Sequence, residues 1–134
     1  MSPDLKKIVG RVRRMFYIEH NGVLSGKCLA ISIIINELCK TYGIKGEIIK
    51  KYISEDKKMF YQHYMVTDGR NVYDTTLINP DCIFDSFEVE NCLSENDKEY
   101  ESKLSQQYID YLNNSSTDIV DKIINFYLPK VNLD

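Results

Sequence analysis

An Asp-Gly pair at residues 68 and 69 separates two segments whose composition is typical of β-strands, residues 60–67 and 70–75. Asp-Gly favours a two-residue type I′ turn, because both central residues of that turn require a positive φ. The sequence therefore predicts a tight β-hairpin in the middle of the chain. Counting residue pairs back from this turn sets His63 directly opposite Asp74. Directly opposed residues share a face, with Cβ atoms about 4.5–5.5 Å apart, so we expect an imidazole–carboxylate hydrogen bond between these two side chains.

Residues 27–42 predict a helix with Cys28 near its start. The run from Cys28 to Ile35 is apolar nearly all round, which is typical of a helix that is buried on most sides. Three consecutive isoleucines, residues 33–35, are also compatible with a strand. The length of the segment, its polar continuation and the stop at Gly43 favour a helix.

The start of this helix is chemically significant for a cysteine. With Ser25 or Gly26 as the N-cap, Cys28 lies in the first turn, where free N–H groups and the positive end of the helix dipole favour a thiolate. The same N–H groups can receive the oxyanion that forms when a thiolate attacks a carbonyl carbon. We expect the hairpin face that carries His63 and Asp74 to contact this helix. A nucleophile, a base and an acid that orients the base would then lie together.

The remaining pattern predicts helices and strands around these two elements. An amphipathic helix over residues 3–19 follows Ser2-Pro3, a favourable cap and first-turn pair. The other predicted elements are a strand over 47–53, an irregular strand over 82–89, and helices near 96–112 and 117–128, the last ending at Pro129. Two helices, three antiparallel strands and then further helices are typical of an α+β domain whose sheet packs on its central helix. We expect residues 1–134 to form that single domain.

Composition narrows the class of protein. A 43% hydrophobic and 28% charged chain is ordinary for a soluble globular protein, and a formal charge of −3 argues against nucleic acid as the partner. We find no apolar run of membrane-spanning length and no signal-peptide pattern, so we expect no membrane association and a cytoplasmic location. The basic residues of the first helix are predicted to form its solvated face; they are Lys6, Lys7, Arg11, Arg13 and Arg14.

The four cysteines agree with a reducing compartment. No C-x-x-C pair is present, and two histidines complete no zinc pattern, so we expect neither a metal nor a cofactor. Cys28 and Cys39 lie about 16 Å apart on one predicted helix, too far for a disulfide. Cys39 is predicted to be a small core residue. Cys82–Cys92 is the one pairing that we consider.

Four segments of the chain together resemble the core of a known family. They are Gly-Lys-Cys-Leu-Ala-Ile-Ser at residues 26–32, residues 38–48 with their Tyr-Gly-Ile, His-Tyr-Met-Val at residues 63–66, and the segment 68–76 that ends in Asp-Thr-Thr. Residues 24–77 in this way resemble the transglutaminase-like superfamily, which belongs to the papain-like fold. The resemblance implies that Cys28 is the nucleophile, His63 the general base and Asp74 the orienting acid.

The resemblance predicts a thiol hydrolase that acts on an amide bond of a protein or peptide substrate, whether peptide, isopeptide or glutaminyl. Acyl transfer to an amine and a catalytically inactive binding module stay open as alternatives. Hydrolysis is favoured because an amine acceptor needs a second shaped channel, for which a chain of this size has little room. His20, Asn21 and Ser25 are the candidates for an oxyanion-binding side chain. The substrate's identity and the oligomeric state stay open.

Overall fold

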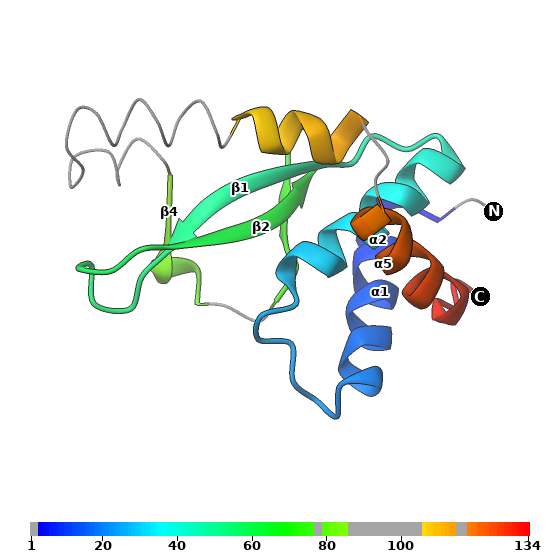
Figure 1. Cartoon of the computed structure of the whole chain (residues 1–134), viewed down its shortest axis with the longest axis horizontal. Coiled ribbons are helices and arrows are strands. Elements are labelled where there is room, and N and C mark those ends of the chain that lie inside the picture. Colours follow the sequence, from blue (N-terminus) through cyan, green and yellow to red (C-terminus); the bar gives the residue numbers. More distant parts are fainter. Residues whose placement is uncertain (1–2, 77–78, 86–105, 115–117) are drawn as a thin grey trace.

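The computed structural model describes residues 3–76, 79–85, 106–114 and 118–134 (Figure 1). Its helices are α1 (Leu5–Glu19), α2 (Cys28–Tyr42) and α5 (Asp118–Tyr127), together with a helical segment at residues 106–114. Its strands are β1 (Glu47–Ile53), β2 (Tyr61–Thr67), β3 (Val72–Asp74) and β4 (Ile83–Phe84). Two short 3₁₀ helices, η1 (Pro80–Cys82) and η2 (Leu128–Lys130), complete the described elements.

The strands form one antiparallel sheet in the order β3-β2-β1-β4. β1 and β2 pair along their full length, whereas β3 pairs with only three residues of β2. Helices α1, α2 and α5 gather at one end of these two long strands, which extend away from them (Figure 1). The predicted α+β class is therefore confirmed, and the irregular strand predicted after residue 82 adds a fourth strand, β4.

Helix ends depart from the predicted caps in two places. Helix α1 begins at Leu5, because the side chain of Asp4 accepts a 2.8 Å hydrogen bond from the Lys7 N–H and so serves as the N-cap in place of Ser2. At α2 the N-cap is Lys27, and no side chain caps the first turn, so the prediction of Ser25 or Gly26 was wrong. The predicted end of α2 is confirmed.

The C-terminal predictions are only partly described by the structure. β4 covers two residues of the strand predicted over 82–89, of which residues 86–89 lie outside the described part. Residues 106–112 of the helix predicted near 96–112 are helical, and the earlier ones lie outside the described residues. α5 ends at Tyr127, just before the 3₁₀ turn that contains Pro129.

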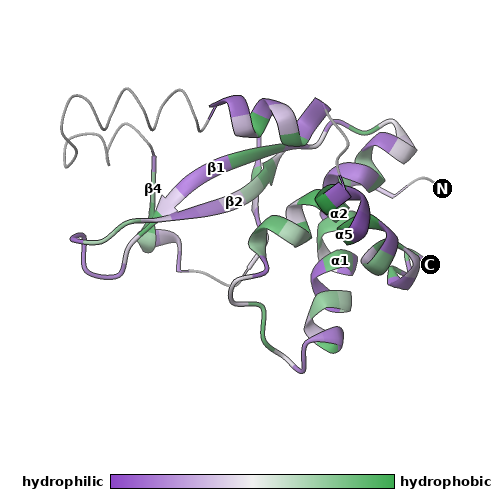
Figure 2. Cartoon of the chain, in the orientation of Figure 1, coloured by the Kyte–Doolittle hydropathy of each residue, from purple (hydrophilic) through white to green (hydrophobic). Residues whose placement is uncertain are grey.

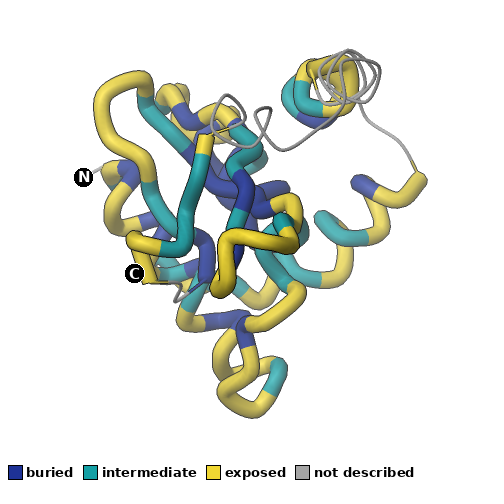
Figure 3. The backbone as a smooth tube through the Cα atoms, turned by 90° about the vertical axis from the view of Figure 1, so that its left-hand side faces the viewer, coloured by how far each residue is buried: buried dark blue, intermediate teal, exposed yellow. Residues whose placement is uncertain are grey.

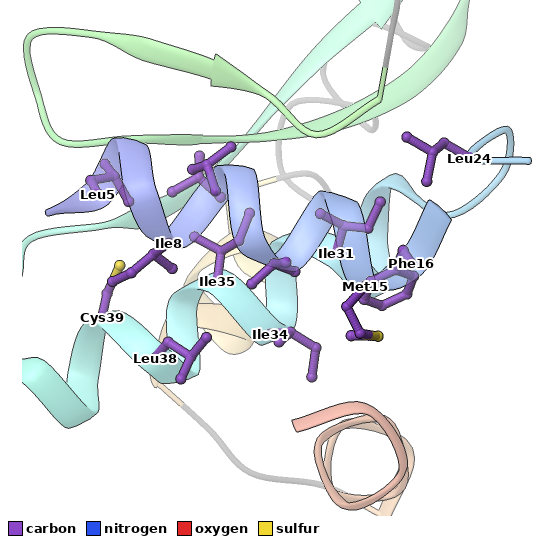
Figure 4. Packing of buried hydrophobic residues seen from close by; sticks show 13 residues of the cluster. Leu5, Ile8, Met15, Phe16, Leu24, Ile31, Ile34, Ile35, Leu38 and Cys39 are labelled. Carbon is purple, nitrogen blue, oxygen red and sulfur yellow. The ribbon is translucent and has the colours of Figure 1, made fainter. Parts of the chain in front are cut away.

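The main core lies between α1 and α2 (Figure 4). Phe16, Ile31 and Ile35 are fully buried there, and the buried stretches run through the interior of the tube in Figure 3. Phe16 also stacks on Tyr127, with ring centroids 4.2 Å apart, so the C-terminal helix is fastened to α1. A second cluster joins Ile33 of α2 to Ile48 and Tyr64 of the sheet; Leu112 and Val120 complete it. The helix that carries Cys28 is thus held between α1 and the sheet.

Hydropathy changes along the two long strands (Figure 2). Their ribbons are hydrophobic near the helices and more hydrophilic toward the loop that joins them, the half in which β2 carries Gln62 and His63. Polar side chains of the sheet are therefore concentrated where the candidate site lies. Within the described segments, no helix has both the length and the apolar character that crossing a membrane requires.

Gly46 provides a test of the packing between α2 and β1. A Cβ atom at Gly46 would lie 2.4 Å from Cys39 Sγ, and Cys39 is buried, so the sulfur has little room to move. We expect Gly46→Ala to lower the free energy of unfolding by about 1–3 kcal/mol, as overpacking does. Urea denaturation measures the change. Gly10→Ala is the matched control: nothing lies within 4 Å of its Cβ, so we expect a gain of about 0.5–1 kcal/mol in the helix. A neutral Gly46→Ala would contradict the close contact.

Candidate active site

The hairpin that carries His63 has a different register from the predicted one. β3 pairs Met65 with Asp74 and Thr67 with Val72, so residues 68–71 form the connection instead of a two-residue turn. Asp68 accounts for the difference, because its carboxylate accepts hydrogen bonds from the Arg70 and Asn71 N–H groups and widens the turn. The prediction that His63 lies directly opposite Asp74 was therefore wrong by two residues.

A shift of two residues leaves the side chains on the same faces, because side chains alternate with a period of two. Asp74 is consequently a diagonal neighbour of His63, and the two do bond: His63 Nε2 lies 3.0 Å from Asp74 Oδ1. The same oxygen accepts a 2.9 Å hydrogen bond from the Thr76 N–H. The His63 side chain is almost fully buried and that of Asp74 is about one quarter exposed. The predicted contact between imidazole and carboxylate is confirmed.

The predicted contact between this hairpin face and the helix is confirmed only at the helix start. Tyr64 and Val66 lie on the opposite face of β2 from His63. These two residues pack in the hydrophobic clusters that the sheet forms with the helices. His63 nevertheless forms a hydrogen bond with Cys28, the first residue of α2. Since Nε2 of the imidazole bonds to Asp74, Nδ1 is the ring nitrogen that remains for the thiol. The structure thus brings Cys28, His63 and Asp74 together in that order.

The position of Cys28 follows from where β3 ends. Extending the β2–β3 register by one step would set Tyr64 opposite Thr75. β3 stops before that pair, and the Thr75 hydroxyl donates to the Tyr64 carbonyl oxygen at 2.6 Å in place of a main-chain N–H. The N–H and C=O of one strand residue point to the same side, so the Tyr64 N–H also faces this vacated edge, where it donates to the Cys28 sulfur. The sulfur of Cys28, the first residue of α2, therefore accepts the Tyr64 N–H at the edge of β2 where β3 has ended.

Charge distribution in the site is set by these contacts. Burial raises the pKa of the Cys28 thiol, but hydrogen bonds from His63, the Tyr64 N–H and the Leu29 N–H, with the charge of His63, hold it below its ordinary value of 9.0. Burial lowers the pKa of His63, but the hydrogen bonds and charges of Asp74 and Cys28 raise it from 6.5 to about 9. Between the lowered pKa of the thiol and about pH 9, the pair therefore exists as thiolate and imidazolium.

Cys39 lacks these contacts. Burial alone raises the pKa of the Cys39 thiol to about 11, which agrees with the predicted core role. Cys82 has a free thiol. Cys92, with which a disulfide was considered, lies outside the described residues. Cys28 is thus distinguished from Cys39 by its hydrogen bonds, and it is also partly exposed whereas Cys39 is buried.

The candidates for an oxyanion-binding side chain are not brought to Cys28. His20 Nε2 lies 2.7 Å from the Tyr127 hydroxyl, in the contact between α1 and the C-terminal helix. Asn21 and Ser25 are exposed in the loop that precedes α2, and no hydrogen bond joins either to Cys28. Main-chain N–H groups are the donors that the structure supplies, because the first turn of α2 has no side-chain cap.

Sequence reasoning missed Tyr64 and Thr75 as members of the site. Each acts through groups that composition does not reveal, a main-chain N–H and a hydroxyl bonded to the main chain. The correct hairpin register would have pointed to them, since it makes Tyr64 and Thr75 the first pair that β3 fails to form. No cluster of three or more metal-ligating side chains occurs among the residues that the structure describes.

Comparisons of the chain with family models, with curated proteins and with solved structures find no match. The residues of the site are therefore the basis for its chemistry.

Thr75 provides a direct test of this geometry. We expect Thr75→Val, which keeps the shape of the side chain and removes the donor, to slow alkylation of Cys28 at pH 7 about tenfold, because the buried Tyr64 carbonyl loses its partner and the strand edge that presents the Tyr64 N–H to the sulfur is no longer fixed. Thr75→Ser keeps the hydroxyl and is expected to restore the rate. Thr67→Val is the matched control, because that hydroxyl donates to the Asn71 carbonyl at the far end of the same hairpin. Equal slowing by both valine variants would show that loss of the fold, and not the Tyr64 contact, is responsible.

Proposed function

We propose that this protein is a thiol hydrolase that cleaves an amide bond through Cys28, His63 and Asp74. The single observation that carries the proposal is the position of the His63 imidazole, which bonds to the Asp74 carboxylate on one side and to the Cys28 thiol on the other. A nucleophile, a base within hydrogen-bond reach and a group that orients the base are the parts that covalent acyl transfer requires.

In the proposed reaction, the Cys28 thiolate attacks the substrate's carbonyl carbon and the carbonyl π electrons move to its oxygen. Main-chain N–H groups in the first turn of α2 stabilise this oxyanion. The intermediate collapses as the carbon–nitrogen bond breaks, and His63 Nδ1 gives its proton to the leaving amine. A water molecule then loses a proton to His63 and attacks the thioester, which releases a carboxylic acid and regenerates Cys28.

Two further observations support the proposal. The resemblance of residues 24–77 to the transglutaminase-like superfamily assigns the same roles to the same three residues. The free thiols of Cys28, Cys39 and Cys82 agree with the cytoplasmic location that we propose, since disulfides are rare in reducing compartments. We propose a protein or peptide as the substrate class.

Selective labelling tests the proposal without knowledge of the substrate. We expect iodoacetamide at pH 7 to modify Cys28 well before Cys39 and Cys82, with a rate that is already high below the pH at which an ordinary thiol ionises. Peptide mass mapping identifies the site. Labelling of Cys28 that rises only above pH 8 would contradict a thiolate–imidazolium pair.

Trapping of the intermediate separates the possible reactions. Incubation with a library of peptide, glutaminyl and isopeptide amides should give a mass increase on Cys28 that decays in water to free acid. Decay only when a primary amine is added would favour acyl transfer over hydrolysis. A labelled Cys28 that forms no acyl-enzyme with any library member would favour a binding module.

A further inference from the structure

A cavity of about 480 Å³ lies at the end of β1 and β2, on the sheet face that carries His63. Ile53 and Tyr61 are paired directly opposite each other and both line this cavity. His63 follows Tyr61 by two residues on the same face of β2, a separation of roughly 6.6 Å along the strand. This spacing equals about two residues of an extended substrate chain.

The walls of the cavity combine apolar surface with carboxylates. Its apolar wall comes from Ile53, Met59, Tyr61 and Cys82, and the polar residues on it are Ser54, Glu55, Asp56 and Asn79. The Met59 and Tyr61 side chains are more than half exposed, which leaves their apolar surfaces available to a ligand. A long unbranched side chain fits such a wall.

The two carboxylates of the cavity differ in their surroundings. Asp56 accepts hydrogen bonds from the N–H groups of Lys58 and Met59 and from the Ser54 hydroxyl, which fixes the loop. Glu55 is exposed, and no hydrogen bond or ion pair engages it within the described residues. The neighbouring Lys57 and Lys58 do not line the cavity.

The cation opposite His63 on this face is already paired with a carboxylate. Lys51 lies opposite His63 in the β1–β2 pairing, and its ammonium group bonds to the Asp85 carboxylate. The cavity therefore combines an apolar wall with the exposed carboxylate of Glu55.

We propose that this cavity binds a substrate side chain with an apolar stem and a cationic end, a lysine or arginine close to the amide bond that is cleaved. The inference rests on the proposed function, because it places the substrate chain along β2 beside Cys28. The stem packs on Met59 and Tyr61, and the cation lies near Glu55.

Three electrophilic probes test the proposal with no knowledge of the natural substrate. They are the N-chloroacetyl amides of lysine, norleucine and glutamic acid, each of which alkylates a thiol with loss of chloride. We expect the lysine probe to alkylate Cys28 about threefold faster than the norleucine probe, in keeping with a partly exposed ion pair. Met59→Ser should slow both of these probes equally, because it removes contact with the stem only.

Charge reversal supplies the decisive comparison. In Glu55→Lys the glutamate probe should react faster than the lysine probe. Glu47→Lys, at the far end of β1, should leave the wild-type order of the three alkylation rates unchanged. An unchanged preference in Glu55→Lys, or equal rates for the lysine and norleucine probes in the wild type, would overturn the cavity assignment and leave the proposed function standing. If all three probes react with Cys28 no faster than with glutathione, the proposed function itself fails.

Discussion

His63→Ala is expected to reduce amide turnover by roughly four orders of magnitude or more, because residues of a catalytic triad act as a unit. The same change should slow alkylation of Cys28 at pH 7 about a hundredfold, because the thiolate is the reactive form. Without His63, only main-chain N–H groups counteract the increase in the Cys28 pKa that burial causes, so this pKa should rise. The pH profile of alkylation, followed by mass spectrometry, measures this rise.

Two variants control this prediction. Cys28→Ala should abolish turnover while the fold persists, and adding His63→Ala to it should cost nothing further. His20→Ala removes the chain's other histidine, which bonds to Tyr127, so it should lower stability and leave the reactivity of Cys28 unchanged. Turnover that survives Cys28→Ala would refute covalent catalysis by this thiol.

The parts of the site that sequence predicts are those set by local patterns. The apolar run from Cys28 to Ile35 fixes α2, and its length, with Gly43 at its end, identifies it as a helix. Alternation along β2 and β3 fixes the faces of His63 and Asp74. This prediction of the faces is correct although the predicted turn is wrong, because the register differs by two residues. A shift of one residue would have separated the two side chains.

The parts that sequence does not predict depend on competition between side chains and the main chain. Asp68 was assigned to a two-residue turn, but its carboxylate takes the N–H groups of Arg70 and Asn71 and lengthens the connection. In the same way, Asp4 replaces Ser2 as a helix cap by bonding to the Lys7 N–H. Several polar residues near each of these ends are able to bond to the main chain, and only the three-dimensional arrangement selects one.

Placement of α2 at the edge of β2 is also a tertiary property. No local pattern shows that β3 ends at Asp74 or that the Thr75 hydroxyl completes the bonding of Tyr64. The cavity beside Tyr61 likewise depends on how the 54–60 loop and η1 meet. Specificity is therefore harder to predict from this sequence than the identity of the reacting groups.

Asp74→Asn is the variant that most sharply tests the role of the carboxylate. In serine-protease triads the corresponding change holds the imidazole in the wrong tautomer and lowers kcat by about 10⁴-fold. Here Asp74 Oδ1 accepts both the Thr76 N–H and the His63 Nε2–H. An asparagine amide oxygen in the same place satisfies both donors, whereas its NH₂ group would face the Thr76 N–H. We therefore expect the correct tautomer to persist.

The expected loss in Asp74→Asn is thus smaller, roughly 10- to 100-fold in turnover, comparable to the loss when the hydrogen-bond partner that orients a metal-bound imidazole is removed. Loss of the negative charge should lower the pKa of His63 from about 9, so the alkaline limit of the imidazolium form moves to lower pH. The pH profile of turnover and the imidazole NMR shifts measure both effects. Asp68→Asn, whose carboxylate accepts two N–H groups on the same hairpin, is the matched control and should leave the profile unchanged. A loss near 10⁴-fold in Asp74→Asn would show that the amide turns its NH₂ group toward His63. The hydrogen bond from the Thr76 N–H would then not be holding the amide oxygen in place.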